Sequence, residues 1–117
     1  MDIEQRPWGS FEVLSDEPTH KVKRLVVDPD QRLSYQRHAH RSEHWVIVTG
    51  TGTVTLDGVD ATVSPGDAVD VECGAKHRIS NSGIAPLVFI EVQLGTSFAE
   101  SDIERFDDDY GRASTGV

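Results

Sequence analysis

The chain has 117 residues and a mass of 12.9 kDa, which suits a single domain. Lys and Arg total 11 against 20 Asp and Glu, and the formal net charge of −9 argues against general binding to nucleic acid or to an anionic membrane, since both need a positive surface. The single cysteine, Cys73, excludes an internal disulfide and suits a reducing cytoplasm, and no apolar run approaches the roughly 18 residues of a membrane span. We expect one cytoplasmic domain over residues 1–117, with its core at about 6–112 and a frayed tail at 113–117.

The apolar residues follow the alternation that is typical of β-strands. In chain order, the predicted strands cover residues 11–14, 20–27, 33–38, 45–49, 53–56, 61–63, 68–71, 77–80 and 86–94. Asp57-Gly58 lies between two of them and is a strong hairpin signal. Short strands separated by turns about every 8–12 residues predict an antiparallel, all-β sandwich or barrel without βαβ units.

One short helix is expected near the C-terminus. Ser101 and Glu104 have the spacing of a capping box, in which each side chain satisfies a free backbone N–H at the start of a helix.

Four of the five histidines lie in two clusters, at residues 36–45 and 66–81: His38, His40, His44 and His77. Alternate residues of a strand share a face, so Gln36, His38 and His40 can point into one cavity. Imidazole nitrogens together with a carboxylate oxygen suit Zn, Fe, Mn, Co or Ni. The clustering therefore predicts one divalent metal per chain.

The two clusters resemble the paired motifs of the cupin superfamily, and here they read Gln36-x-His38-x4-Glu43-x6-Gly50 and Gly66-x5-Glu72-x-Gly74-x2-His77-x3-Asn81. Gln36 stands where the superfamily has its first His, and Glu72 stands where Pro is usual. This resemblance implies the cupin-type double-stranded β-helix, or jelly roll.

A narrower resemblance covers nearly the whole chain, from about Arg6 to Arg112. Residues 6–9, 36–45, 88–93 and 108–112 are similar to the type II mannose-6-phosphate isomerase domain, which forms the C-terminal part of bifunctional mannose-1-phosphate guanylyltransferase/isomerase enzymes. The resemblance implies a metal-dependent interconversion of mannose 6-phosphate and fructose 6-phosphate in carbohydrate metabolism. The chain shows no Gly-rich nucleotide loop near its start, so guanylyl transfer is not expected here, and a separate guanylyltransferase chain is a candidate partner.

By this resemblance the metal ligands are Gln36, His38, Glu43 and His77, with zinc preferred over Co, Mn, Fe and Ni. A competing set replaces Gln36 by His40 or His44, because an amide oxygen is a weaker donor than imidazole for these metals.

Aldose–ketose isomerisation moves a proton between C1 and C2, and it needs an acid–base group and a cation for the phosphate. The resemblance makes Arg41, expected in a loop at the cavity mouth, the first candidate for contact with the phosphate or the transition state. Lys76 is a second catalytic candidate, and Arg78 and His40 are further candidates for substrate binding.

Two other classes of function stay open. The chain could be a cupin enzyme of another class, such as an Fe(II) oxygenase, which the identity of the metal would reveal. It could also be a non-enzymatic module that binds a sugar or sugar phosphate without turnover. Small cupins commonly pair, so a homodimer is expected, with residues 86–94 and the N-terminal strand at its interface.

Overall fold

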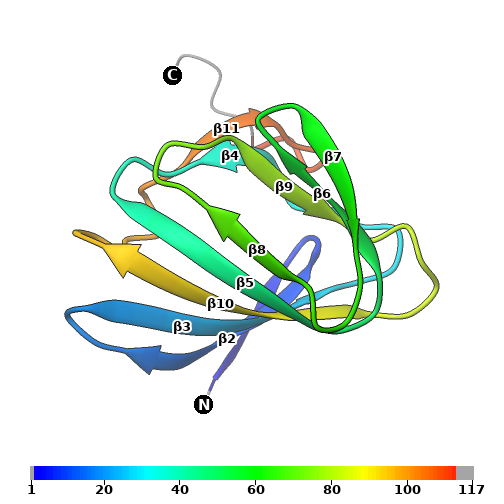
Figure 1. The fold of residues 1–117 in the computed structure, drawn as a ribbon, viewed down its shortest axis with the longest axis horizontal. Coiled ribbons are helices and arrows are strands. Elements are labelled where there is room, and N and C mark those ends of the chain that lie inside the picture. The colour runs from blue at the N-terminus through cyan, green and yellow to red at the C-terminus, as the bar shows by residue number, and fades with distance from the viewer. Residues whose placement is uncertain (1, 113–117) are drawn as a thin grey trace.

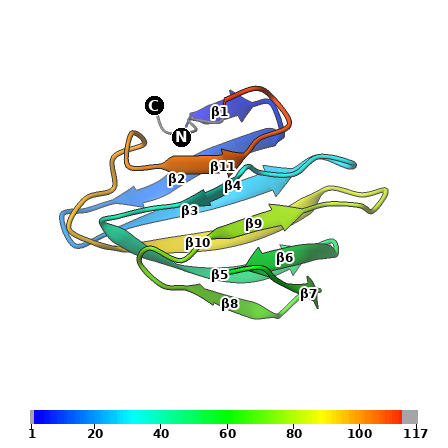
Figure 2. The same ribbon diagram turned by 90° about the horizontal axis from the view of Figure 1, so that it is seen from above.

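The computed structural model describes residues 2–112, which fold into two antiparallel sheets that face each other (Figures 1 and 2). The larger sheet has the strand order β1-β2-β3-β10-β5-β8, and the smaller one has the order β11-β4-β9-β6-β7. In chain order the strands are β1 (Ile3–Arg6), β2 (Gly9–Asp16), β3 (His20–Val27), β4 (Tyr35–Arg37), β5 (Arg41–Thr49), β6 (Gly52–Leu56), β7 (Val59–Val63), β8 (Ala68–Val71), β9 (His77–Ser80), β10 (Leu87–Gly95) and β11 (Glu104–Asp107).

The all-β prediction is confirmed, and β3, β8 and β9 have the predicted bounds. The hairpin turn at Asp57 and Gly58 is also present, with φ values of 45° and 83° that match the preference of Asp-Gly for positive φ. Two strands, β1 and β11, were not predicted, because their residues are largely exposed or half-buried and do not alternate between apolar and polar.

The predicted C-terminal helix is wrong: residues 2–112 contain no α-helix, and hence none that could cross a membrane. Glu104 begins β11, which pairs with β4. The carboxylate of Asp102 accepts hydrogen bonds from the backbone N–H groups of Ala39 and His40, both at 2.9 Å. Residues 102–104 thus form hydrogen bonds with residues distant in sequence in place of the hydrogen bonds within a helix. The predicted tail at 113–117 lies outside the described residues.

The inner face of the larger sheet changes from apolar to polar along its central strands. Alternation along β5 turns Ile47, Trp45, Glu43 and Arg41 inward in that order, and all four are buried. The neighbouring β10 follows the same order, from Leu87 and Phe89 to Glu91 and Gln93. The apolar half packs with Val54 and Ile79 of the smaller sheet in one buried cluster, and within the larger sheet the rings of Trp45 and Phe89 lie 5.0 Å apart. The polar half lines a pocket.

Two motif residues have structural roles. Gly50 has a φ of 85°, and a Cβ there would lie 2.6 Å from the carbonyl oxygen of Pro86. Asn81 is 2% exposed and donates hydrogen bonds to the carbonyl oxygens of Val27 and Ala85, while its own oxygen accepts one from the N–H of Gly83. These residues hold the turns at the apolar end of the barrel.

Residues 86–94, predicted at a homodimer interface, mostly form β10 in the interior of the larger sheet. Both edges of β10 are hydrogen-bonded, to β3 and to β5, so this strand has no free edge for pairing with a second copy. The homodimer itself stays a prediction.

Candidate active site

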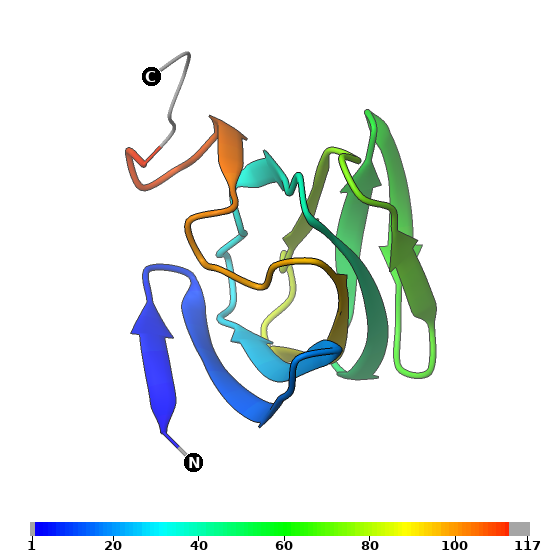
Figure 3. The ribbon, with the colours of Figure 1, turned by 90° about the vertical axis from the view of Figure 1, so that its left-hand side faces the viewer.

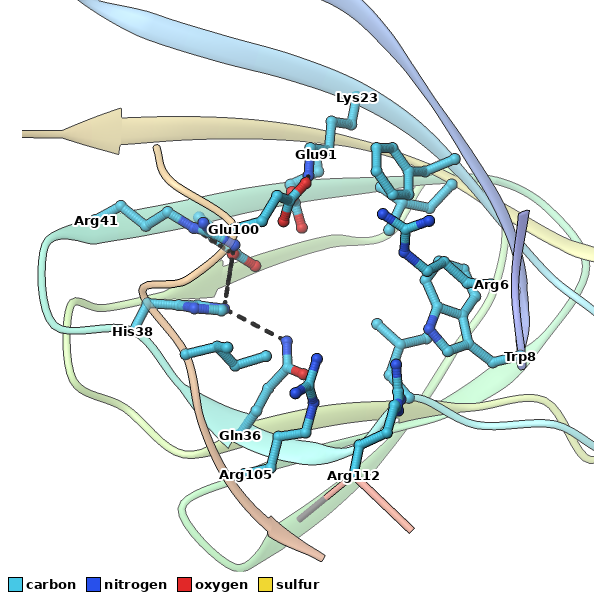
Figure 4. A pocket seen from close by; sticks show the side chains of 15 residues that line it. Arg6, Trp8, Lys23, Gln36, His38, Arg41, Glu91, Glu100, Arg105 and Arg112 are labelled. Carbon is cyan, nitrogen blue, oxygen red and sulfur yellow. Dashed lines mark hydrogen bonds and ion pairs between the residues drawn. The ribbon is translucent and has the colours of Figure 1, made fainter. Parts of the chain in front are cut away.

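The pocket opens between the sheets, at the polar end of the barrel (Figure 4). Three groups of polar side chains line it: two potential metal ligands, His38 and Glu43, a wall of arginines, and a group of acidic residues with one lysine. They come from β1, β3, β4, β5, β10 and the segment 100–112.

The potential metal ligands His38, Glu43 and His77 are buried, and one ligand atom from each lies within 4.8 Å of the other two. Nε2 of His38 is 3.1 Å from Glu43 Oε2, and Nε2 of His77 is 3.7 Å from Glu43 Oε1. Glu43 comes from the inner face of β5, His77 begins β9, and His38 follows β4.

Backbone carbonyls set the orientation of both imidazoles. His38 Nδ1 lies 2.7 Å from the carbonyl oxygen of Asp102, and His77 Nδ1 lies 2.9 Å from that of Ala75. A carbonyl oxygen only accepts, so Nδ1 carries the proton in each ring and Nε2 presents a lone pair to the cluster. Nε2 of His77 is buried and has no hydrogen-bond partner in the described part of the chain, which is costly unless something binds it. A divalent metal fits this set of donors.

Gln36 stands beside the cluster. Its Oε1 accepts a hydrogen bond of 2.6 Å from the Ser34 hydroxyl, and its Nε2 is 3.4 Å from His38 Nε2. A metal needs the amide oxygen, and the Ser34 hydroxyl can either donate or accept. A flipped Gln36 amide would therefore keep its bond to Ser34 and turn its oxygen toward the cluster.

The electrostatics of the cluster favour the charge states that a metal needs. Burial acts to raise the pKa of Glu43, but the adjacent imidazoles of His38 and His77 and the guanidinium of Arg41 hold that pKa well below its usual range. Burial lowers the pKa of His77, so this imidazole is neutral at neutral pH. Trp45 Nε1 also donates to Glu43 Oε1, at 3.1 Å.

Arg41 does not lie in a loop at the cavity mouth as expected. It begins β5 and is buried, with its Nε and Nη2 donating to Glu43 Oε2 at 3.0 and 2.9 Å. The positive charge of this guanidinium thus compensates the negative charge of the buried Glu43 carboxylate. Arg41 nevertheless lines the pocket.

The structure places the other predicted site residues outside the pocket. His40 is exposed, and His44 lies on the outer face of β5 with Nδ1 2.9 Å from Asp70. The Lys76 ammonium lies over the ring of Phe106. Arg78 donates to the Leu33 carbonyl oxygen and to Asp107. The expected roles of these four side chains find no support in the geometry.

Arginines that the sequence reasoning did not assign to substrate, Arg6, Arg105 and Arg112, line the pocket opposite Glu91 (Figure 4). Arg105 is paired in register with Gln36, which is paired in turn with His77, so the three residues form one row across β11, β4 and β9. Nε of Arg105 is buried and no described residue accepts a hydrogen bond from it, and burial together with the positive charge of Arg112 lowers the pKa of Arg105. A buried guanidinium of this kind is suited to donate a hydrogen bond to an anionic ligand. The pairing of β11 with β4 had no sequence signal, so Arg105 could not be found from the pattern.

The acidic group lies against the larger sheet. Glu91 is buried on β10, where Gln93 Nε2 donates to its Oε1 at 2.6 Å. Burial and the negative charge of Glu43 raise the pKa of Glu91 to about 8. Lys23 Nζ, also buried, lies 2.6 Å from Glu100 Oε1.

Two antiparallel sheets closed around a buried His-Glu-His cluster give this protein the double-stranded β-helix fold of cupin domains, as the sequence motifs suggested. The chain belongs more narrowly to the mannose-6-phosphate isomerase C-terminal family, whose model matches residues 2–108.

Relatives of known name agree with this assignment. The chain is 42% identical over 107 residues to a mannose-1-phosphate guanylyltransferase of Escherichia coli K12, covering 92% of this chain but 22% of that protein. Among solved structures, a putative sugar phosphate isomerase from Acidithiobacillus ferrooxidans aligns with a TM-score of 0.60 at 27% identity, over 65% of this chain and 50% of that one. A double-stranded β-helix protein from Klebsiella pneumoniae aligns with a TM-score of 0.72 at 20% identity, over 82% of each chain.

His38→Ala should abolish stoichiometric metal binding, because it removes one of the clustered donors. His44→Ala is the matched control: it removes an imidazole from the outer face of β5 and should leave the metal content unchanged. Elemental analysis after dialysis against zinc measures both. Full metal in His38→Ala, or its loss in His44→Ala, would contradict this ligand set.

Glu91→Gln should change how stability depends on pH in the metal-free protein. The Glu91 carboxyl has a pKa of about 8 when folded, against an ordinary value of 4.5, so the folded state binds more protons between these limits. Its contribution to the free energy of unfolding is therefore complete below about pH 4.5 and is lost as the pH rises toward 8. Relative to wild type, the variant should gain stability from pH 5 to pH 8.5 in urea denaturation with chelator present. Parallel pH profiles for the two proteins would refute the assignment.

Proposed function

We propose that this protein is a metal-dependent isomerase that interconverts mannose 6-phosphate and fructose 6-phosphate. The observation that carries the proposal is the arrangement of one pocket, which is lined both by several arginines and by His38 and Glu43, two members of a cluster suited to a divalent metal. The family assignment and the likeness to a putative sugar phosphate isomerase support it. Because the chain spans about a fifth of the length of the guanylyltransferase it matches, the activity of that longer protein is not carried over as a whole.

His38, Glu43 and His77 would hold the metal, with Gln36 as the fourth ligand after rotation of its amide. When bound, a divalent metal such as zinc polarises the substrate oxygens and stabilises the negative charge that develops on an enediolate. The chain's own residues must then bind the phosphate and move the proton.

The arginines meet the need for a phosphate site. A guanidinium binds a phosphate by two parallel hydrogen bonds, and Arg105 offers a buried Nε that has no hydrogen-bond partner among residues 2–112. Arg112 is held in place by Asp108, which accepts from its Nε at 2.9 Å. The net charge of −9 would by itself repel a phosphorylated sugar, but the positive charge of these arginines is concentrated where the phosphate would bind.

Glu91 is the best placed group for proton transfer between C1 and C2. Lys23 and Glu100 neutralise each other across 2.6 Å, and Glu43 belongs to the metal cluster. Glu91 is the remaining carboxyl group of the pocket lining, and its Oε1 is oriented by Gln93.

A non-enzymatic sugar-phosphate-binding module is the second candidate. It is favoured by the small share of the relatives' length that this domain represents, since a domain of a longer protein can bind a ligand for a neighbouring activity. The same experiment separates the two functions.

Turnover of mannose 6-phosphate should appear when metal-free protein receives Zn or Co, and it should vanish again with chelator. The assay couples production of fructose 6-phosphate to a dehydrogenase, with Zn, Co, Mn and Fe(II) added back separately. Binding of mannose 6-phosphate by calorimetry without turnover under any metal would select the binding module. Neither binding nor turnover would reject both functions.

Arg105→Ala should raise the KM for mannose 6-phosphate on the order of 10- to 100-fold, as expected for the loss of a charge-assisted hydrogen bond. Its metal content should stay that of wild type. Lys76→Ala removes one positive charge outside the pocket and is the matched control, so its KM should not change. An unchanged KM in Arg105→Ala would remove this residue from the substrate site.

A further inference from the structure

The chain between β10 and β11 passes across the opening of the barrel (Figure 3, orange). We call residues 96–112, which include this crossing and β11, the strap. The strap supplies Glu100, Ile103, Arg105 and Arg112 to the pocket lining. Through Asp102, the strap also contacts His38 on the side of the imidazole that faces away from Glu43.

Asp102 makes three hydrogen bonds to the turn that carries the ligand His38. Its carbonyl oxygen accepts from His38 Nδ1 at 2.7 Å. Its two carboxylate oxygens accept from the N–H groups of Ala39 and His40, both at 2.9 Å. One residue therefore orients the imidazole and holds the main chain that follows it.

Other anchors hold the carbonyl side of the same turn. The N–H of Gly74 donates to the His38 carbonyl oxygen, and the N–H of Thr96 donates to that of His40, each at 2.9 Å. The turn therefore keeps part of its support when the Asp102 carboxylate is removed, but its two N–H groups lose their acceptor. A change confined to this carboxylate should loosen the turn without dismantling the barrel.

We propose that Asp102 is a positioning residue for the metal centre, and that the carboxylate of Asp102 keeps His38 Nε2 aimed at Glu43 and His77. This inference rests on the proposed metal site and adds a residue outside the ligand set. The same segment carries Arg105, so docking of the strap through Asp102 places a metal ligand and a pocket arginine together.

Three other aspartates of the strap serve as a comparison. Asp107, Asp108 and Asp109 accept from the side chains of Arg78, Arg112 and Arg32 respectively. Asp109 uses both oxygens, as Asp102 does, with Arg32 Nε at 2.8 Å and Nη2 at 2.9 Å. Asp109 thus fastens the strap by a two-point contact that does not reach the turn at residues 38–40.

Titration of the metal-free full chain with Co²⁺, followed by visible absorption, tests the proposal without substrate. Asp102→Ala should weaken cobalt binding about 10- to 100-fold, the range typical of residues that orient metal ligands, and should alter the cobalt spectrum. Asp109→Ala should bind cobalt like wild type, with an unchanged spectrum. Asp102→Asn, which keeps one acceptor oxygen, should fall between Asp102→Ala and wild type, and it replaces Asp102→Ala if the alanine variant does not fold.

The outcomes separate this inference from the proposed function. Wild-type binding by Asp102→Ala or Asp102→Asn would overturn the inference and leave the metal site intact. Equal weakening in Asp102→Ala and Asp109→Ala would also overturn it, since strap attachment in general would then be responsible. Failure of the wild-type chain to bind cobalt, zinc, manganese or iron would reject the metal site itself, and the inference with it.

Discussion

The site is built around one buried carboxylate. Glu43 is 1% exposed, and burying an ionised group costs several kcal/mol unless neighbouring charges and hydrogen bonds compensate it. Arg41, Trp45 and His38 all direct donors or ring nitrogens at its two oxygens. These partners lie on β5 itself or on the turn before it, so the arrangement of that stretch follows from the need to keep this charge satisfied.

The alternation of β5 and β10 then determines what the rest of the barrel can be. Each strand turns apolar residues inward along one half and polar residues inward along the other. Where both are apolar, Trp45 and Phe89 join Val54 and Ile79 of the smaller sheet in one buried core. Where both are polar, a packed core would leave charges unpaired, so the sheets enclose a pocket instead. A barrel with one dry end and one charged end is the consequence.

The C-terminal strap completes this pocket from a distance in sequence. β11 pairs with β4, which sets Arg105 beside Gln36, and Asp102 binds the turn that carries His38. The candidate ligand cluster and the arginine wall therefore both contact one segment, which lies about 60 residues away from the first motif. Displacing this segment would therefore disturb both the candidate metal cluster and the arginines of the pocket.

Much of this could be read from the sequence, because strand alternation, Asp-Gly turns and motif spacing are local properties. The strand pattern and the Asp57-Gly58 hairpin were predicted in this way, whereas the grouping of His38, Glu43 and His77 was implied by the resemblance to the cupin motifs. The capping-box spacing at Ser101 misled, because a helix cap is a local preference and the bonds of Asp102 and β11 to distant residues outweigh it. Which cations face the pocket was decided by tertiary structure alone: Lys76 and Arg78 flank a ligand in sequence yet point elsewhere, whereas Arg105 reaches the site through pairing between strands far apart in the chain.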